Sequence, residues 1–151
     1  MPQDQSQPIT LHPIGVVRNA VTSPRPDGWA GVESRIDVDD AHRQGLAGLE
    51  GFSHVIVVCW LHLVPEPLRT TEPEPAGPGL PAVGAFASRR QTRPNPFGVS
   101  VVSVVRRAEG ALVVQGLDAV DGTPVLDIKP YLPPYDRVAA ARMPRWVWGK
   151  A

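Results

Sequence analysis

Apolar and polar residues alternate along much of the chain, and this alternation predicts strands rather than helices. The clearest case is residues 53–62, where period two places a mostly apolar set of side chains on each face. Because both faces are mostly apolar, we expect this strand to lie in the centre of a sheet. The same criteria predict further strands over residues 9–17, 34–38, 82–87, 99–106, 111–116 and 124–129.

Turn signals separate several of these strands. Glu109-Gly110 predicts a hairpin between residues 99–106 and 111–116, and Asp121-Gly122 predicts the next turn. One short helix is predicted over residues 39–49, with Asp40 as a candidate N-cap. About seven short strands with little helix favour a mainly β fold, namely a small single-sheet β-barrel.

Composition supports the same fold class. The 18 prolines and 14 glycines among 151 residues exclude a mainly helical protein, because a proline inside a helix costs about 3 kcal/mol. The length suits one domain spanning residues 1–151. Within it we expect residues 1–8 to be disordered and residues 65–81, which hold six prolines, to form a polyproline-like loop.

Charge and cysteine content exclude several kinds of protein. The 15 basic and 15 acidic residues leave no net field to recruit nucleic acid or membrane. The single cysteine, Cys59, excludes a disulfide framework and a cysteine-rich zinc site, and it favours a reducing, cytoplasmic location. His54 and His62 share a strand face but stand roughly 26 Å apart at about 3.3 Å per residue, so they cannot bind one metal ion. We predict no metal, no signal peptide and no membrane segment.

The first stretch that can carry chemistry is residues 84–98. It places Arg89, Arg90 and Arg93 in a loop stiffened by Pro94 and Pro96. Arginine side chains bind carboxylates and phosphates through two parallel hydrogen bonds, and a rigid loop lowers the entropy cost of holding them in place. The alternative is a solvated basic loop without a ligand.

The second stretch is residues 116–131, which gather acidic residues around a turn. Asp118, Asp121 and Asp127 are the kind of side chain that binds ribose hydroxyls or a ligand ammonium group. The alternative is turn chemistry at Asp121-Gly122 and an ion pair between Asp127 and Lys129, and the spacing alone favours that alternative. No glycine-rich phosphate motif is present, which argues against a Rossmann-type methyltransferase or dehydrogenase.

Several segments together resemble the TsaA/TrmO (YaeB-like) family. They are IGVVR at residues 14–18, LEGFSH at 49–54, WLH at 60–62, ASRRQTRPNPFG at 87–98 and DAVDGTPVLDIKPY at 118–131. The resemblance spans nearly the whole chain. It implies a single-sheet β-barrel that binds S-adenosylmethionine, usually as a homodimer. It also implies methylation of N6 of threonylcarbamoyladenosine beside the anticodon of tRNA.

Carried over by position, the resemblance implies a cofactor site. Arg89 would pair with the methionine carboxylate, and Asp118 or Asp121 with the ribose or the ammonium group. If RNA is the acceptor, we expect Arg90 and Arg93 to contact it. In an extended segment Arg90 points to the side opposite Arg89, and Arg93 precedes a rigid turn and presents its guanidinium outward. The full cofactor set is His62, Leu63, Arg89, Val99, Gly116, Leu117, Asp118 and Asp121, and the RNA set is Arg90, Arg93 and Asn95.

The methyl acceptor nitrogen must also lose a proton. The candidate bases are Asp121, Lys129 and Tyr131, and the residues do not decide among them; water is a further alternative. Two other functions remain open: methylation of a smaller substrate, and a non-catalytic barrel that binds RNA or the cofactor. A tRNA substrate needs a basic strip, for which the candidates are Arg89, Arg90, Arg93, Arg106 and Arg107. The exposed segment Trp146-Val147-Trp148 predicts a homodimer.

Overall fold

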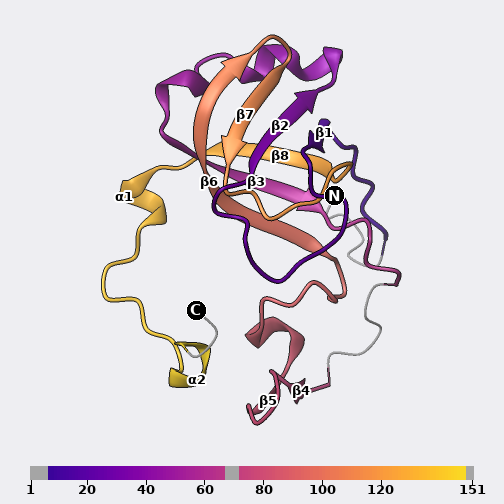
Figure 1. The fold of residues 1–151 in the computed structure, drawn as a ribbon, viewed down its shortest axis with the longest axis vertical. Coiled ribbons are helices and arrows are strands. Elements are labelled where there is room, and N and C mark those ends of the chain that lie inside the picture. Colours follow the sequence, from indigo (N-terminus) through magenta and orange to yellow (C-terminus); the bar gives the residue numbers. More distant parts are fainter. Residues whose placement is uncertain (1–6, 67–71, 149–151) are drawn as a thin grey trace.

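The computed structural model describes residues 7–66 and 72–148, and in this part of the chain a closed antiparallel β-barrel forms the body of the molecule (Figure 1). The strands follow one another around the barrel in the order β1-β2-β7-β6-β3-β8. Their bounds are β1 (Gly15–Arg18), β2 (Glu33–Val38), β3 (His54–Trp60), β6 (Phe97–Ala108), β7 (Ala111–Gln115) and β8 (Pro124–Pro130). The predicted mainly β fold and single-sheet barrel are confirmed.

The strand predicted over residues 82–87 is wrong for most of its length. Only β5 (Ala82–Val83) is extended, and it pairs with β4 (Glu74–Pro75) in a separate two-stranded sheet outside the barrel. The 3-10 helix η3 (Ala85–Ala87) follows at once. Prolines at positions 75, 78 and 81 lack the N–H group that a longer ladder needs, so the described barrel has six strands rather than seven.

The predicted helix over residues 39–49 is two 3-10 helices instead. They are η1 (Asp40–Leu46) and η2 (Leu49–Gly51), and Gly48 separates them with a positive φ of 93°. Asp39, not Asp40, occupies the N-cap position of η1, and its side chain makes no capping hydrogen bond. The glycines at positions 45 and 48 explain the break, because glycine weakens a helix and adopts left-handed conformations at little cost.

The first strand is shorter than residues 9–17. Only β1 (Gly15–Arg18) pairs with neighbours, on one side with β2 and on the other with β8. Ile9 is 86% exposed, and the chain before Ile14 forms no strand. Pro8 and Pro13 have no backbone N–H to donate to a neighbouring strand, which explains why β1 begins only at Gly15.

The core lies inside the barrel, where alternate residues of every strand point inward. β3 lies between β6 and β8, which confirms its predicted central position. Cys59 on this strand is 2% exposed, and burial, with a smaller contribution from the charge of Asp118, raises the pKa of its thiol to about 12. The thiol is therefore a small buried apolar group and not a nucleophile. The fully buried apolar side chains of this core include Val17, Ile36, Val55, Val57, Leu112, Val114 and Val125.

Two glycine turns and a terminal arm complete the fold. Gly110 (φ 64°) turns β6 into β7 and Gly122 (φ 84°) precedes β8, as the turn signals predicted. After β8 the chain leaves the barrel through α1 (Pro133–Asp136) and ends in α2 (Arg145–Trp148), beside the β4–β5 sheet (Figure 1). We call residues 131–148 the C-terminal arm.

Candidate functional site

His62 and Leu63 follow β3 directly, at one end of the barrel. They line a hollow with Asp118, which follows β7, and with Trp29 from the long loop between β1 and β2. The enclosed volume is only about 20 Å³, room for about one water molecule. A larger ligand therefore has to lie over the open surface around the hollow. Its remaining lining residues are Pro24, Leu61, Val64, Gln91, Ala119, Val120 and Thr123.

Arg89 and Asp118 approach this end from different segments, and the start of β6 connects them. Nη2 of Arg89 donates a hydrogen bond to the carbonyl oxygen of Val99, with 3.2 Å between nitrogen and oxygen. The neighbouring Ser100 donates its hydroxyl to Oδ1 of Asp118. Arg89, Val99 and Asp118 are all exposed, so a basic group, an apolar surface and an acidic group face solvent side by side. This arrangement suits a ligand that carries both a carboxylate and an ammonium group.

The other predicted cofactor residues take different positions at the same end. Gly116 turns the chain after β7 with φ 91°. Leu117 is 1% exposed, so its side chain packs in the core and only its backbone can reach a ligand. Oδ1 of Asp121 accepts the backbone N–H of Asn19 at 3.1 Å, and Oδ2 lies 3.9 Å from Arg18. Asp121 therefore already holds two partners.

Asn19 is a structural residue of this end that sequence reasoning missed. Its Nδ2 donates to Oγ of Ser34 at 2.9 Å and to the carbonyl oxygen of Ala119 at 2.8 Å, while its Oδ1 accepts the backbone N–H of Val21. These bonds tie the β1–β2 loop to the segment that carries Asp118. An asparagine in a proline-rich loop gives no sign of partners 100 residues away, so nothing in the sequence alone could have identified it.

The arginines predicted to bind RNA are largely engaged within their own segment. Arg90 forms an ion pair with Glu74 at 2.7 Å and its side chain is 24% exposed. The prediction that Arg93 presents its guanidinium outward is wrong for Nη1, which donates to the carbonyl oxygens of Ala85, Ser88 and Arg90 at 3.0, 2.7 and 3.4 Å. These short-range bonds brace the loop that holds Arg89. Whether either residue also contacts RNA stays a prediction.

Asn95 is exposed and lines a separate hollow next to the strand end. Trp60 and Phe97 form part of its wall, and their rings meet edge to face with centroids 5.6 Å apart. The volume is about 690 Å³, and Leu11, Pro13 and Leu126 contribute further apolar surface. The carbonyl of Pro96 accepts the N–H of Leu61 at 2.8 Å, which places this hollow beside the segment that leads to His62.

Two of the three candidate bases lie far from this end. Tyr131 donates its backbone N–H to His54 at the opposite end of β3, whereas Val125 pairs with Cys59. The six residue steps from Val125 to Tyr131 span roughly 20 Å of strand. Lys129 forms the expected ion pair with Asp127 at 2.8 Å, and this hydrogen bond raises the pKa of the lysine. Among the candidates, only Asp121 stands at the same end as His62.

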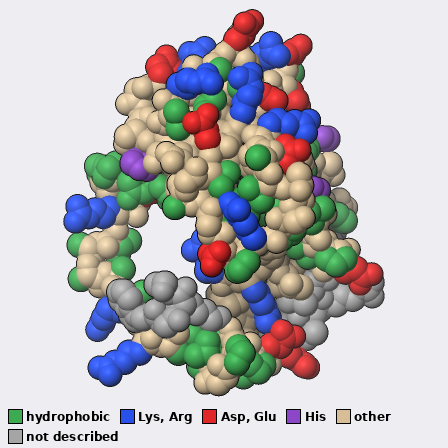
Figure 2. All heavy atoms as spheres, in the orientation of Figure 1, with side chains coloured by type: hydrophobic (Ala, Val, Ile, Leu, Met, Phe, Trp, Pro, Cys, Tyr) green, Lys and Arg blue, Asp and Glu red, His purple; other side chains and the backbone are tan. Residues whose placement is uncertain are grey.

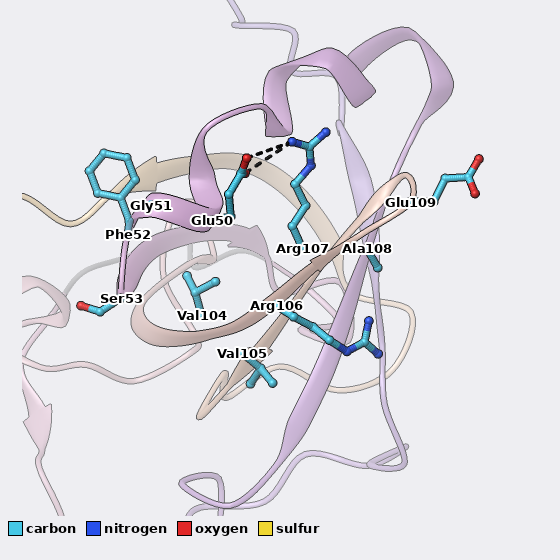
Figure 3. A pocket seen from close by; sticks show the side chains of 10 residues that line it. All are labelled: Glu50, Gly51, Phe52, Ser53, Val104, Val105, Arg106, Arg107, Ala108 and Glu109. Atoms are coloured by element: carbon cyan, nitrogen blue, oxygen red, sulfur yellow. Dashed lines mark hydrogen bonds and ion pairs between the residues drawn. The ribbon is translucent and has the colours of Figure 1, made fainter.

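The opposite end of β6 carries another hollow, with a volume of about 800 Å³ (Figure 3). Arg107 points across it to Glu50 at 3.4 Å, while Arg106 extends away from that pair (Figure 3). The pKa of Glu50 is lowered, chiefly by a backbone N–H hydrogen bond and further by Arg107. Arg106 stands seven residues, or roughly 23 Å, beyond the Val99 carbonyl that Arg89 contacts, so the predicted strip of five arginines is not continuous.

Charges at this opposite end are mixed. Lys, Arg, Asp and Glu side chains alternate over it in Figure 2, and Arg35 pairs with Asp37 at 2.5 Å and Arg43 with Asp40 at 2.8 Å. In the described ranges, no three His, Cys, Asp or Glu side chains gather as metal ligands would. Within the same ranges, every helix is too short or too polar to span a membrane.

Comparison with known proteins gives consistent results. A probable S-adenosyl-L-methionine-binding protein of Pyrococcus abyssi is 34% identical over 139 residues, which cover 85% of this chain and 71% of that protein. A mouse tRNA (adenine(37)-N6)-methyltransferase is 37% identical over 91 residues, 60% of this chain and 21% of that protein. The crystal structure of TrmO from Pseudomonas aeruginosa superposes with a TM-score of 0.72 at 33% identity, over 90% of this chain and 62% of that one. The chain thus spans less than two thirds of that solved protein.

The described chain is a small closed β-barrel with a hollow at the end that carries His62 and Asp118, built on a plan unrelated to the Rossmann sheet. The family model described as the tRNA-methyltransferase O N-terminal domain matches residues 18–137. The chain therefore belongs to the TsaA/TrmO family of S-adenosylmethionine-dependent methyltransferases, which confirms the predicted family and its cofactor.

Proposed function

We propose that this chain transfers a methyl group from S-adenosylmethionine to N6 of adenosine in tRNA, and that the acceptor is threonylcarbamoyladenosine next to the anticodon. The family model and the mouse relative support a tRNA adenine acceptor. The observation that carries the cofactor part is the grouping of His62, Arg89 and Asp118 at one barrel end, linked through Val99 and Ser100.

The groups at this end fit the charges of the cofactor. Arg89 keeps N–H donors free of the Val99 carbonyl and can bind the methionine carboxylate. Asp118 can accept a hydrogen bond from the ammonium group or the ribose, and Leu63 and Val99, each 49% exposed, offer apolar surface to the adenine. When bound, the cofactor supplies an electrophilic methyl group on a sulfonium sulfur. The chain contributes chiefly alignment of that methyl group with the acceptor nitrogen.

The acceptor base fits the neighbouring hollow that contains Asn95. An asparagine amide pairs with the hydrogen-bonding edge of adenine, and aromatic side chains such as Trp60 and Phe97 contact unstacked bases. Because this hollow adjoins the segment before His62, a base held there lies next to the proposed cofactor site. Asp121 is the candidate at the same end for taking the proton from N6, with water as the alternative acceptor.

A methyl-transfer assay tests this proposal. The protein is incubated with isotopically labelled S-adenosylmethionine and with tRNA from a strain that lacks this modification, and the nucleosides are separated by mass spectrometry. We expect label only in threonylcarbamoyladenosine. Label in another nucleoside would overturn the acceptor, and cofactor binding without any transfer to tRNA would favour a small-substrate enzyme or a non-catalytic barrel.

We further propose that the protein is a cytoplasmic homodimer. Three neighbouring strand pairs, Trp60–Phe97, Val58–Val99 and Ile56–Val101, form an apolar surface on the outside of β3 and β6. Phe97, Val99 and Val101 are 37%, 49% and 54% exposed. An apolar patch of this kind favours contact with a second copy. Such a copy would also cover the open surface beside the small His62 hollow.

Charging this surface is expected to separate the dimer. Val101→Lys places an ammonium group in the Ile56–Val101 pair, at one edge of the patch. Val105→Lys, at a position 44% exposed nearer the other end of β6, is the matched control. Light scattering should give twice the chain mass for the wild type and the control, and one chain mass for Val101→Lys. A wild type with the mass of one chain at micromolar concentration would refute the dimer.

Trp146 and Val147 do not form the exposed surface from which the sequence predicts a dimer. Trp146 and Val147 are half-buried and face a hollow shared with Phe86, Arg89 and Met143. The side chain of Trp148 and residues 1–6 of the segment 1–8 that is predicted to be disordered fall outside the described residues. The single-domain organisation of residues 1–151 stays a prediction.

A further inference from the structure

The C-terminal arm is the most exposed part of the described chain. Every residue from 132 to 145 is exposed, and Tyr135 and Val138 are 83% and 72% exposed. The arm begins at Tyr131, whose ring meets His54 edge to face at 6.3 Å. It ends with α2 against the segment that holds Arg89. It therefore passes outside the barrel from one end of β3 toward the cofactor end.

The arm also carries three basic side chains that lack acidic partners within the described chain. Arg137, Arg142 and Arg145 form no ion pair with any carboxylate of the described residues. The single acidic residue between positions 131 and 148, Asp136, accepts the backbone N–H of Leu132 at 2.7 Å. Basic side chains project along the arm in Figure 2. Elsewhere Arg35, Arg43, Arg90 and Arg107 are paired with carboxylates. Arg25, Arg89 and Arg93 donate to backbone carbonyls instead, and Arg106 pairs with no described carboxylate.

Three unpaired arginines on one exposed segment matter because the whole chain has no net charge. A neutral protein has no long-range field to attract a polyanion, so any such binding must rest on a local group of unpaired cations. Arg137, Arg142 and Arg145 form such a group. Arginine binds phosphate through two parallel hydrogen bonds, and the exposed Tyr135 ring offers a surface for stacking an unpaired base.

We propose that the C-terminal arm binds the phosphate backbone of RNA through Arg137, Arg142 and Arg145. This inference rests on the proposed tRNA acceptor. It assigns RNA binding to the arm rather than to the loop of Arg90 and Arg93, whose guanidinium groups are engaged by Glu74 and by backbone carbonyls. Because α2 lies beside the Arg89 segment, RNA held along the arm is delivered to the end of the barrel where the cofactor binds.

A salt titration of tRNA binding tests the arm. The triple variant Arg137→Gln, Arg142→Gln, Arg145→Gln is compared with the wild type and with a control triple variant, Arg35→Gln, Arg43→Gln, Arg107→Gln, whose arginines are ion-paired at the opposite end. Loss of three phosphate contacts should reduce the slope of log K against log salt by about 2 units, at about 0.7 per contact with single-stranded RNA. The control should keep nearly the wild-type slope, and calorimetry should give all three proteins the same affinity for S-adenosylmethionine.

The outcomes separate the arm from the proposed function. If the wild type binds and methylates tRNA but the arm variant keeps its slope, the arm proposal is overturned and the function stands. If the wild type neither binds nor methylates tRNA, both are overturned. If light scattering shows that the arm variant changes oligomeric state while its salt slope stays the same, the arm binds a second copy of the chain and the RNA assignment is wrong.

Discussion

Gly15→Ala is expected to lower the free energy of unfolding by about 3 kcal/mol, near the upper end of the usual cost of overpacking. Gly15 is buried at the start of β1, between Val38 of β2 and Val125 of β8. A Cβ atom there would lie 2.1 Å from the carbonyl oxygen of Asp37 and 3.0 Å from Cα of Val38. Both are backbone atoms, so the clash is relieved only by moving a strand of the barrel.

Urea unfolding followed by circular dichroism measures the effect, with Gly45→Ala as the matched control. Gly45 is exposed in η1, and a Cβ atom at that position meets no atom within 4 Å. The same substitution there should change the free energy of unfolding by less than about 1 kcal/mol, and can be slightly stabilising because alanine reduces the entropy of the unfolded chain. Equal losses in the two variants would show that the close approach at Gly15 does not limit stability.

Alternation of apolar and polar residues predicted the barrel strands wherever the ladder is uninterrupted. β2, β3, β6, β7 and β8 all fall close to their predicted ranges, because successive side chains of a strand point to opposite faces and apolar residues mark the buried ones. The errors concentrate where proline or glycine interrupts the backbone hydrogen bonds. Residues 9–14, 39–49 and 82–87 each have a plausible side-chain pattern, but the hydrogen bonds available to their backbones decide the outcome.

The candidate site was predictable mainly through long sequence motifs. Period and spacing identified Arg89 and Asp118 only as members of a basic and an acidic segment. Their connection depends on Ser100 and on backbone contacts between segments far apart in the chain. The placement of Lys129 and Tyr131 away from His62 follows from the register of β8 on β3, which no single-strand pattern specifies.

The arginine loop illustrates why charge alone is a poor guide to function. Arg89, Arg90 and Arg93 look equivalent in the sequence, yet each has a different partner. One contacts the start of β6, one pairs with Glu74, and one binds three carbonyl oxygens of its own loop. Backbone carbonyls satisfy a guanidinium group as well as a ligand does, and their positions depend on the local fold.

Arg89→Ala is expected to weaken S-adenosylmethionine binding about 10- to 150-fold, which corresponds to the loss of roughly 1.5–3 kcal/mol from a charge-assisted contact. Of the three loop arginines, Arg89 is the exposed one. It donates to the carbonyl oxygen of Val99, and the next residue, Ser100, donates to Asp118. Arg89→Lys keeps the charge but loses the planar pair of donors, so its affinity should fall between those of the wild type and Arg89→Ala.

Isothermal titration calorimetry with S-adenosylmethionine measures all three proteins, and Arg106→Ala is the matched control. Arg106 is also exposed, but it lies near the far end of β6 and points away from the Glu50–Arg107 pair (Figure 3). Its removal should leave the affinity unchanged, because no charged group of the proposed cofactor site lies near it. If Arg89→Ala and Arg106→Ala bound the cofactor with the same affinity, the loss of one positive charge would explain both results. The contact to the carboxylate would then have to be made by another residue.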